Sequence, residues 1–362
     1  MPSAPQLDPP HLSSNQMPKL QSSCAFPAIF VWKRASALGF ALCALAMFGP
    51  VHSRTASAQS PETVHFDSAN KDVKLTAYLY RPDGKQWPGP RPAIVLLHGR
   101  SGVFSSSAKR FDSSTLSSRT VLWGKFWAER GYVGLYVDSF GPRGHAKGFE
   151  AGTNKAGMRP TEVNEITVRP HDAMQGLKYL RSLPEVDARN VFLQGWSNGG
   201  SATLSTMHEK TAAMDKPDRD AGFRAAIAVY PACRGVARHY GEPYRSYAPL
   251  LLLIGTEDEE VSFSQCESFA QRAREGDVTF VRYEGATHSY DTPTAKRSGV
   301  AANAKATEDT MKRAEAFFAA QTWKAPPKAV SKSADAAEKS VREPKADPTS
   351  RAPPAASTSP SE

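Results

Sequence analysis

Residues 195–199 read GWSNG and directly follow the apolar run VFLQ at 191–194. A serine on a tight turn from a strand into a helix has its hydroxyl pushed away from the backbone, and a glycine on either side lets neighbouring chain pass closely. The pattern therefore predicts a nucleophile elbow with Ser197 at its centre. A serine that only caps a helix after a strand gives the same letters, so the partners of Ser197 decide between the two.

The candidate base must follow Ser197, because serine, acid and histidine come in that order along chains that use this elbow. Three histidines do so. His208 falls within the helix that the elbow opens, and His239 precedes the next strong strand with no strand-end acid before it. His288 follows a β-branched and aromatic run that stops at a glycine, which is typical of a strand end. His288 is therefore the predicted base.

The candidate acid should end the strand that precedes this histidine. Residues 249–255 read PLLLLIG, a strongly strand-like run, and four acidic residues follow directly after Thr256. Such a run is also typical of a solvated loop. Asp258 lies 258 − 197 = 61 residues after the serine and 288 − 258 = 30 before the histidine, close to two and one strand–helix–strand units of about 30 residues. We predict Asp258 as the acid, with Glu257 as the alternative.

Acyl transfer also needs two backbone N–H groups directed at the developing oxyanion. Asn198, the residue after the candidate nucleophile, supplies the first. The second should come from the glycine-containing loop that follows an earlier apolar strand. There we predict the amide of Arg100, with Ser101 as the alternative. His98 precedes the serine and is predicted to be structural, and Asp138, at another strand end, is predicted to order its loop.

Apolar runs alternate with helical patterns along the middle of the chain. Helices are expected over 121–130, 172–183 and 307–320, where apolar residues recur at helical spacing. Because the strands are apolar throughout, they indicate a mostly parallel sheet with helices on both faces, an α/β fold. The expected strands are 73–80, 93–97, 133–137, 191–194, 225–230, 249–255 and 281–284.

Five motifs follow one another in this region: LLHGRSGV at 96–103, GYVGLYVDSFGPRG at 131–144, GWSNGG at 195–200, GTEDEEV at 255–261 and YEGATHSYD at 283–291. In this order they resemble the dienelactone hydrolase family of α/β-hydrolases, over about residues 62–321. The resemblance implies the α/β-hydrolase fold and matches Ser197, Asp258 and His288 to the positions of a catalytic triad.

The namesake of that family has a cysteine as nucleophile and a glutamate after the histidine of the first motif, where this chain has Ser197 and Gly99. A serine depends on its histidine to remove the proton, whereas a thiol can ionise beforehand. The resemblance therefore implies a serine relative that hydrolyses carboxylic esters, with lactones as a further class, through an acyl-enzyme. One alternative is a serine peptidase of the prolyl-oligopeptidase type, although the chain is short for a propeller domain. Another is a non-catalytic binding protein on the same fold.

Three residues near the motifs have two interpretations each. Trp196 and Tyr290 adjoin the candidate catalytic residues and either line the acyl pocket or only pack. Arg143 either contacts an acidic substrate or ties down its own loop. The polar stretches 101–119 and 141–167 follow strand ends, so they are either walls of the pocket or plain surface loops.

The two ends of the 362-residue chain do not have globular compositions. Residues 1–58 contain a basic pair, an apolar run of 15 residues and a small-residue cleavage pattern, which predicts a signal peptide, with Met17 as an alternative start. The apolar run is shorter than the about 20 residues of a membrane span, so no stable membrane insertion is expected after cleavage. Residues 323–362 are predicted to be a disordered tail, which leaves 59–322 as the hydrolase domain.

An exported protein, periplasmic or secreted, is therefore expected. Cleavage would leave Cys233 and Cys266, which in an oxidising compartment form either a disulfide or two buried thiols. The net charge of +9 comes without a basic stripe that contains aromatic residues, so no nucleic-acid partner is predicted. Since metal-ligand clusters, phosphate loops and nucleotide fingerprints are missing from the sequence, we predict no cofactor and a small-molecule ester as the partner. No oligomeric state is predicted.

Overall fold

A computed structural model describes residues 60–70, 72–153 and 159–324. Eight strands form one sheet in the order β1-β2-β4-β3-β5-β6-β7-β8, and all neighbours from β4 to β8 are parallel. Strands β1 and β2 pair antiparallel at one edge. The predicted α/β fold with a mostly parallel sheet is confirmed. The strands are β1 (Glu62–Asp67), β2 (Lys74–Tyr80), β3 (Arg91–Leu97), β4 (Val133–Asp138), β5 (Val186–Trp196), β6 (Ala226–Val229), β7 (Leu250–Glu257) and β8 (Val278–Thr287).

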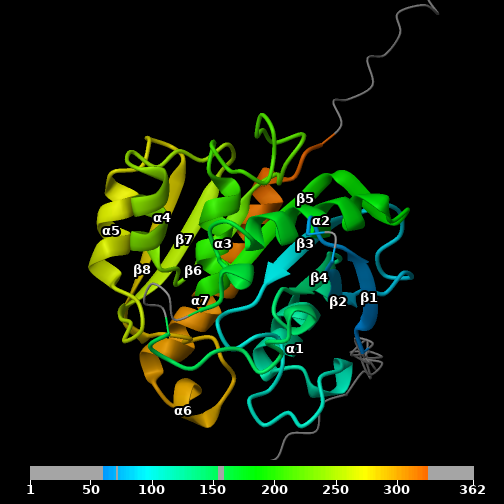
Figure 1. The fold of residues 1–362 in the computed structure, drawn as a ribbon, viewed down its shortest axis with the longest axis horizontal. Coiled ribbons are helices and arrows are strands. Elements are labelled where there is room, and N and C mark those ends of the chain that lie inside the picture. Colours follow the sequence, from blue (N-terminus) through cyan, green and yellow to red (C-terminus); the bar gives the residue numbers. More distant parts are fainter. Residues whose placement is uncertain (1–59, 71, 154–158, 325–362) are drawn as a thin grey trace, which may run out of the picture. The chain divides into compact units, whose positions relative to one another are not determined.

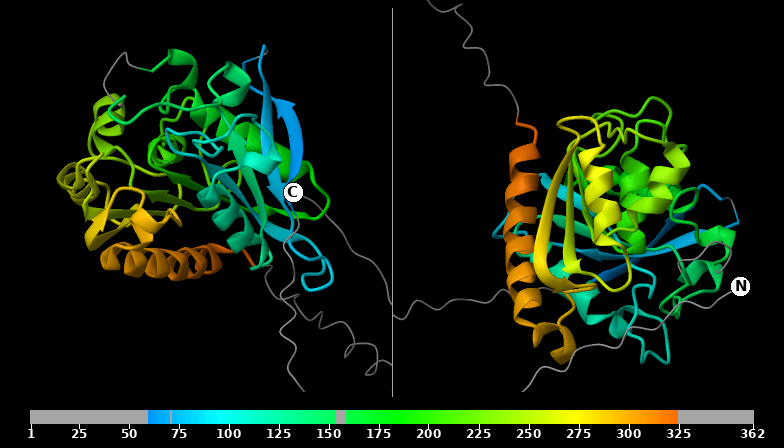
Figure 2. Two further views of the ribbon diagram at one scale, coloured as in Figure 1. Left: turned by 90° about the horizontal axis from the view of Figure 1, so that it is seen from below. Right: turned by 90° about the vertical axis from the view of Figure 1, so that its left-hand side faces the viewer.

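Helices cover both faces of the sheet (Figures 1 and 2). On one face lie α1 (Ser118–Ala128) and α7 (Ala301–Gln321), which touch through the rings of Trp127 and Phe318, with centroids 5.4 Å apart. The other face carries α2 (Arg169–Ser182), α3 (Asn198–Met207), α4 (Cys233–Tyr240) and α5 (Phe263–Gln271). The short α6 (Ala295–Ser298) precedes α7. The central strands are thus buried on both sides, which explains their apolar, non-alternating sequences.

Strand β1 and helix α4 are among the elements that were not expected from the sequence. Strand β1 is an edge strand with only Val64 buried, so its sequence lacks a continuous apolar run. Helix α4 buries only Cys233 and Val236 and contains a glycine, which weakens any helical pattern. Helix α2 begins three residues earlier than predicted, because Pro170 occupies its first turn, where the missing N–H costs nothing.

The elbow has the geometry that its glycines allow. Ser197 has φ 54° and ψ −116°, a conformation that a non-glycine residue rarely adopts. A Cβ on Gly195 would lie 2.2 Å from the carbonyl oxygen of Gly199, and a Cβ on Gly199 would lie 2.1 Å from that of Leu97. A larger residue at Gly195 would therefore push β5 and the start of α3 apart, and one at Gly199 would push the elbow away from β3.

Cys233 and Cys266 form a disulfide, with their Cα atoms 5.1 Å apart. The bond joins the start of α4 to α5 and is buried. Of the two alternatives for this pair, the structure therefore has the bridge. It links two helices that otherwise follow different strands.

The predicted signal peptide, 1–58, and nearly all of the predicted tail lie outside the described residues. Trp323 is an exception to the expected boundary at 322, because its backbone N–H donates to Asn190 at 2.7 Å and the Arg189 guanidinium lies over its ring. The ordered chain therefore continues past 322. Within the described ranges, no helix is both long and apolar enough to cross a membrane.

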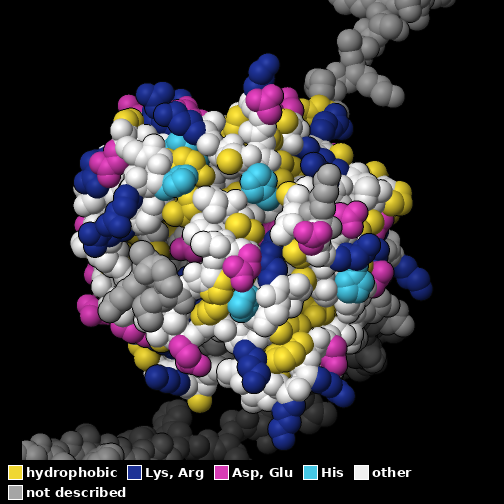
Figure 3. All heavy atoms as spheres, in the orientation of Figure 1, with side chains coloured by type: hydrophobic (Ala, Val, Ile, Leu, Met, Phe, Trp, Pro, Cys, Tyr) yellow, Lys and Arg dark blue, Asp and Glu magenta, His cyan; other side chains and the backbone are white. Residues whose placement is uncertain are grey.

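Basic and acidic side chains are interspersed on the face seen in Figure 3. Neither the positively nor the negatively charged side chains form a continuous stripe over the elements on this face.

The disulfide should stabilise the domain mainly by restricting the unfolded chain. It closes a loop between residues 33 apart in sequence, which corresponds to about 3 to 4 kcal/mol. The double variant Cys233→Ala/Cys266→Ala should therefore unfold at a clearly lower urea concentration than the oxidised wild type. A reductant should lower the midpoint of the wild type and leave that of the variant unchanged. Equal midpoints for oxidised and reduced wild type would contradict this expectation.

Candidate active site

Three strand ends bring the predicted triad residues together. Ser197 follows β5, Asp258 follows β7 and His288 follows β8. The Nε2 atom of His288 lies 3.0 Å from Ser197 Oγ, and its Nδ1 atom lies 2.8 and 3.0 Å from the two carboxylate oxygens of Asp258. Since the Nδ1–H group donates a hydrogen bond to Asp258, Nε2 carries the lone pair and can accept the hydrogen bond of the serine hydroxyl.

Asp258, rather than the alternative Glu257, contacts the histidine. The Asp258 side chain is fully buried, whereas Glu257 is exposed. One Asp258 oxygen also accepts hydrogen bonds from the backbone N–H groups of Glu260 (3.0 Å) and Val261 (2.8 Å). These amides fix the carboxylate in the orientation that meets His288.

The two predicted oxyanion-hole amides are both available. Within the described ranges, the backbone N–H groups of Arg100 and Asn198 donate to no protein acceptor. Both residues line the same cavity as Ser197. Ser101, the alternative to Arg100, is exposed and does not line that cavity. The arrangement therefore favours Arg100 as the second donor.

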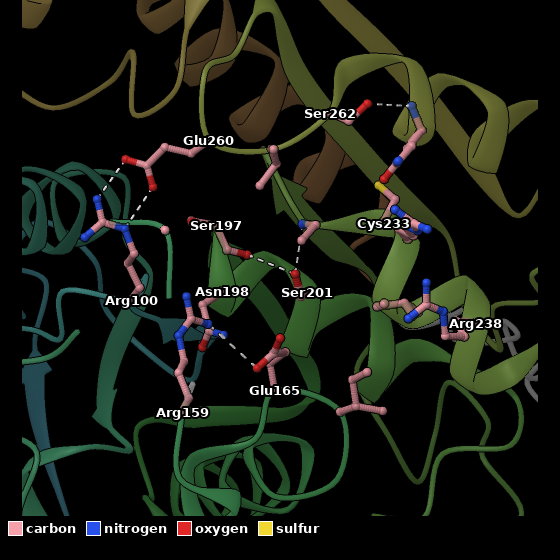
Figure 4. Close-up of a pocket in the computed structure, with 18 residues that line it drawn as sticks. Arg100, Arg159, Glu165, Ser197, Asn198, Ser201, Cys233, Arg238, Glu260 and Ser262 are labelled. Carbon is pink, nitrogen blue, oxygen red and sulfur yellow. Dashed lines mark hydrogen bonds and ion pairs between the residues drawn. The ribbon is translucent and has the colours of Figure 1, made fainter. Parts of the chain in front are cut away.

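The Arg100 side chain closes one side of this cavity through a bidentate ion pair with Glu260 (Figure 4). Nε and Nη2 of Arg100 donate to the two Glu260 oxygens, each at 2.8 Å, and Nη1 donates to the Phe149 carbonyl at 2.9 Å. These hydrogen bonds hold the pKa of Glu260 below its ordinary value. One Glu260 oxygen also lies 3.7 Å from Nε2 of His288, where a negative charge stabilises the protonated imidazole.

Glu259 holds the backbone of the histidine. Its carboxylate accepts from the His288 N–H at 2.8 Å and from Arg297 at 2.7 Å. Both Glu259 and Glu260 stand in the acidic run from which the sequence analysis chose Asp258. The acidic run in the sequence therefore pointed to Glu259 and Glu260 as well, but the sequence did not show which partner each of them binds.

A second buried network supports the loop of His288. The Tyr230 ring lies 4.7 Å from the imidazole, and its hydroxyl donates to Asp291. Arg119 donates to the Tyr230 hydroxyl at 2.8 Å and to Ser289 at 3.2 Å. Burial raises the pKa of Tyr230 well above its ordinary value, so its hydroxyl remains a donor. The sequence analysis did not identify these residues, although Asp291 ends the last of the five motifs.

His98 and Asp138 take the structural roles that were expected. The His98 ring donates from Nδ1 to the Gly99 carbonyl at 2.7 Å and accepts at Nε2 from the Ser139 N–H at 3.2 Å. Burial lowers the pKa of His98 well below its ordinary value, so the ring is neutral. Asp138 accepts from the N–H groups of Phe140 and Gly141 and orders the turn after β4.

The cavity beside Ser197 has a volume of about 430 Å³. Arg159 and Glu165 in its wall show that part of the stretch 141–167 is a pocket wall, whereas no residue of 102–119 lines it. Arg234 and Arg238, one turn apart on α4, also line the cavity and add two positive charges. Figure 4 labels Arg238. Neither has an ion-pair partner among the described residues.

Three predicted substrate contacts are corrected by the structure. Trp196 is fully buried and its ring stacks on Tyr136, while Tyr290 is buried with its hydroxyl 2.7 Å from that of Thr310. Arg143 forms a bidentate ion pair with the buried Asp172. None of the three lines the cavity. Of the two interpretations given for each, core packing and loop fastening are the ones observed.

No group of three or more metal-ligating side chains occurs among residues 60–70, 72–153 and 159–324. The side chains and amides around Ser197 can carry out proton transfer, nucleophilic attack and stabilisation of an oxyanion by backbone N–H groups.

Two curated proteins are similar to parts of the chain. The quorum-quenching protein AidA of Acinetobacter baumannii is 28% identical over 176 residues, which are 48% of this chain and 49% of AidA. The probable dipeptidyl-aminopeptidase B of Grosmannia clavigera is 35% identical over 106 residues, 29% of this chain and 9% of that protein. The chain thus spans less than half of either relative.

Solved structures show the same fold. Thermogutta terrifontis esterase 2, phosphorylated by paraoxon, has a TM-score of 0.52 and 19% identity, covering 74% of this chain and 97% of that one. Its apo form gives 0.51 and 20% with the same coverage. The sequence itself matches the dienelactone hydrolase family over residues 75–322, which is more than half of the chain. The fold, the elbow and this match agree, and the chain belongs to the dienelactone hydrolase family.

Proposed function

We propose that the protein is a serine hydrolase that cleaves carboxylic esters through an acyl-enzyme, with Ser197, His288 and Asp258 as its catalytic triad. The observation that supports this most directly is the continuous hydrogen-bonded series from Asp258 through His288 to Ser197, with distances of 2.8 and 3.0 Å. This series joins an acid, a base and a nucleophile in the order that acyl transfer requires.

The reaction has two proton-balanced steps. His288 takes the Ser197 proton as Oγ attacks the ester carbonyl, and the resulting imidazolium returns that proton to the departing alcohol. A water then attacks the acyl-enzyme with the same histidine as base, and the proton passes to Ser197 as the acid product leaves. Asp258 holds the imidazole in its tautomer, and the free N–H groups of Arg100 and Asn198 receive the oxyanion. Loss of one such donor costs about 3 kcal/mol.

The cavity charges support a preference for esters whose far end is acidic. Arg234 and Arg238 lack carboxylate partners among the described residues, and Arg159 has only Glu165, at 3.9 Å. An anionic substrate group would satisfy these cations. We propose half-esters of dicarboxylic acids, and lactones that carry a carboxylate, as the substrate classes to test.

Export is part of the same proposal. The Cys233–Cys266 disulfide is typical of oxidising compartments, which supports export by a cleaved signal at 1–58. The mature protein would then consist of a hydrolase domain at 59–322 and a disordered tail. The ordered Trp323 moves the start of such a tail slightly later.

Ser197→Ala should lower the turnover of p-nitrophenyl acetate by about 10⁴-fold or more, because the nucleophile is lost. The matched control is Ser205→Ala on the same helix, which removes a buried hydroxyl that donates only to the Ser201 carbonyl and should leave turnover near that of the wild type. A fluorophosphonate probe should label the wild type and Ser205→Ala but not Ser197→Ala. Faster cleavage of matched peptide amides than of esters would instead indicate a peptidase.

Replacing both pocket arginines, Arg234→Gln/Arg238→Gln, should raise the KM for the p-nitrophenyl half-ester of succinate by about fivefold. This corresponds to about 1 kcal/mol, as expected for exposed charges. The KM for p-nitrophenyl butyrate, which has the same acyl length without the charge, should not change. A similar increase for both substrates would mean that the variant disturbs the pocket rather than a charge contact.

A further inference from the structure

Arg169, the first residue of α2, is a fully buried cation. Its Nη1 donates to the side-chain oxygen of Asn198, and its Nη2 donates to the backbone carbonyl of His98 at 2.9 Å. Both acceptors are neutral. Nε has no hydrogen-bond partner, and no carboxylate oxygen of the described residues lies within 4.0 Å of the guanidinium.

The two acceptors belong to the two segments that hold the oxyanion-hole amides. Asn198 directly follows Ser197 at the start of α3, and His98 stands two residues before Arg100 at the end of β3. A single planar guanidinium therefore connects both segments from behind the site. Because its donors have a fixed angle to one another, it also fixes the spacing of the two segments.

The positive charge of Arg169 is not matched by a bound carboxylate. The nearest acidic residue on its own helix, Asp172, accepts two hydrogen bonds from Arg143, at 2.8 and 2.9 Å. The Phe140 ring lies 5.1 Å from the guanidinium carbon. Burial lowers the pKa of Arg169 to about 10, which leaves it protonated at neutral pH. The charges of Asp172, Glu165 and Asp138 attract this cation through space without a hydrogen bond to it. A buried cation with no directly bonded carboxylate is unfavourable for folding, so its position calls for a functional explanation.

We propose that Arg169 is a positioning residue of the oxyanion hole, which sets the spacing of the Arg100 and Asn198 amides and places a permanent positive charge behind them. The inference rests on the proposed function, since it requires an oxyanion at Ser197. As the serine attacks, the carbonyl π electrons move onto oxygen, and the negative charge grows at the N-terminal end of α3. A fixed buried charge stabilises that state more than the neutral ester. Arg169 should therefore act on kcat more than on KM.

Arg169→Met, which keeps an unbranched stem but removes the charged guanidinium, should lower kcat for p-nitrophenyl acetate by about 100-fold with KM within about threefold of the wild type. Arg169→Lys keeps the charge but not the two-pronged geometry, and should lower kcat by about tenfold. The affinity for a trifluoromethyl ketone, which forms an oxyanion adduct with the serine, should fall by the same factor as kcat/KM in each variant.

The matched control is Arg181→Met, at the other end of α2. Arg181 also donates to backbone carbonyls, those of Ala188, Ala221 and Gly222 among them, but lies outside the cavity. This variant should lose stability and keep kcat and KM. A kcat equal to that of the wild type in Arg169→Met would overturn the inference. A loss of kcat that is fully explained by the fraction of unfolded protein, measured by urea titration, would overturn it too. If Arg169→Met does not fold, unchanged kcat and inhibitor affinity in Arg169→Lys overturn it. Full activity of Ser197→Ala would instead remove the proposed function itself.

Discussion

The site depends on one close contact between backbones, where the elbow passes the end of β3. Gly199 lies against the carbonyls of Leu97 and His98, at a distance that leaves no room for a Cβ. The register of the sheet sets this contact, because Leu97 pairs with Gly195. The contact keeps Ser197 in its positive-φ conformation and brings the segment of Arg100 beside Asn198. A strand pair and two missing side chains thus determine where the nucleophile and both amides lie.

The acidic loop after β7 shows how one run of like residues is divided among different tasks. Strand β7 pairs with β6 as far as Leu253 and continues with β8 to Glu257, so its loop reaches the histidine. There Asp258 accepts from the imidazole, Glu259 accepts from the backbone of His288, and Glu260 binds Arg100. Adjacent side chains point in different directions at a turn, which places three carboxylates around one histidine without all three facing it. Only the first lies on the imidazole edge opposite the serine.

Much of this arrangement could be predicted from the sequence, because its determinants are local. The fold followed from apolar runs and their alternation with helices, and the contacts of Ser197, Asp258 and His288 agree with what chain order and spacing suggested. Boundaries were less accurate. Strand β1 has most of its residues exposed and so lacks an apolar run, and helix α4 has only eight residues, too few for a helical period to stand out.

The second layer of the site could not be predicted, because it consists of contacts between segments far apart in the chain. Three arginines illustrate this. Arg143 is bound by a buried carboxylate, Arg119 by hydroxyl groups around the histidine loop and by Asp291 at 3.8 Å, and Arg169 only by neutral oxygens. In the sequence, all three are simply arginines. What separates a structural ion pair from a buried charge without a bonded carboxylate behind an oxyanion hole is which partner is within reach, and that depends on tertiary packing. The local sequence pattern therefore identifies the reacting groups, whereas the partners of the surrounding charges can be assigned only from the folded structure.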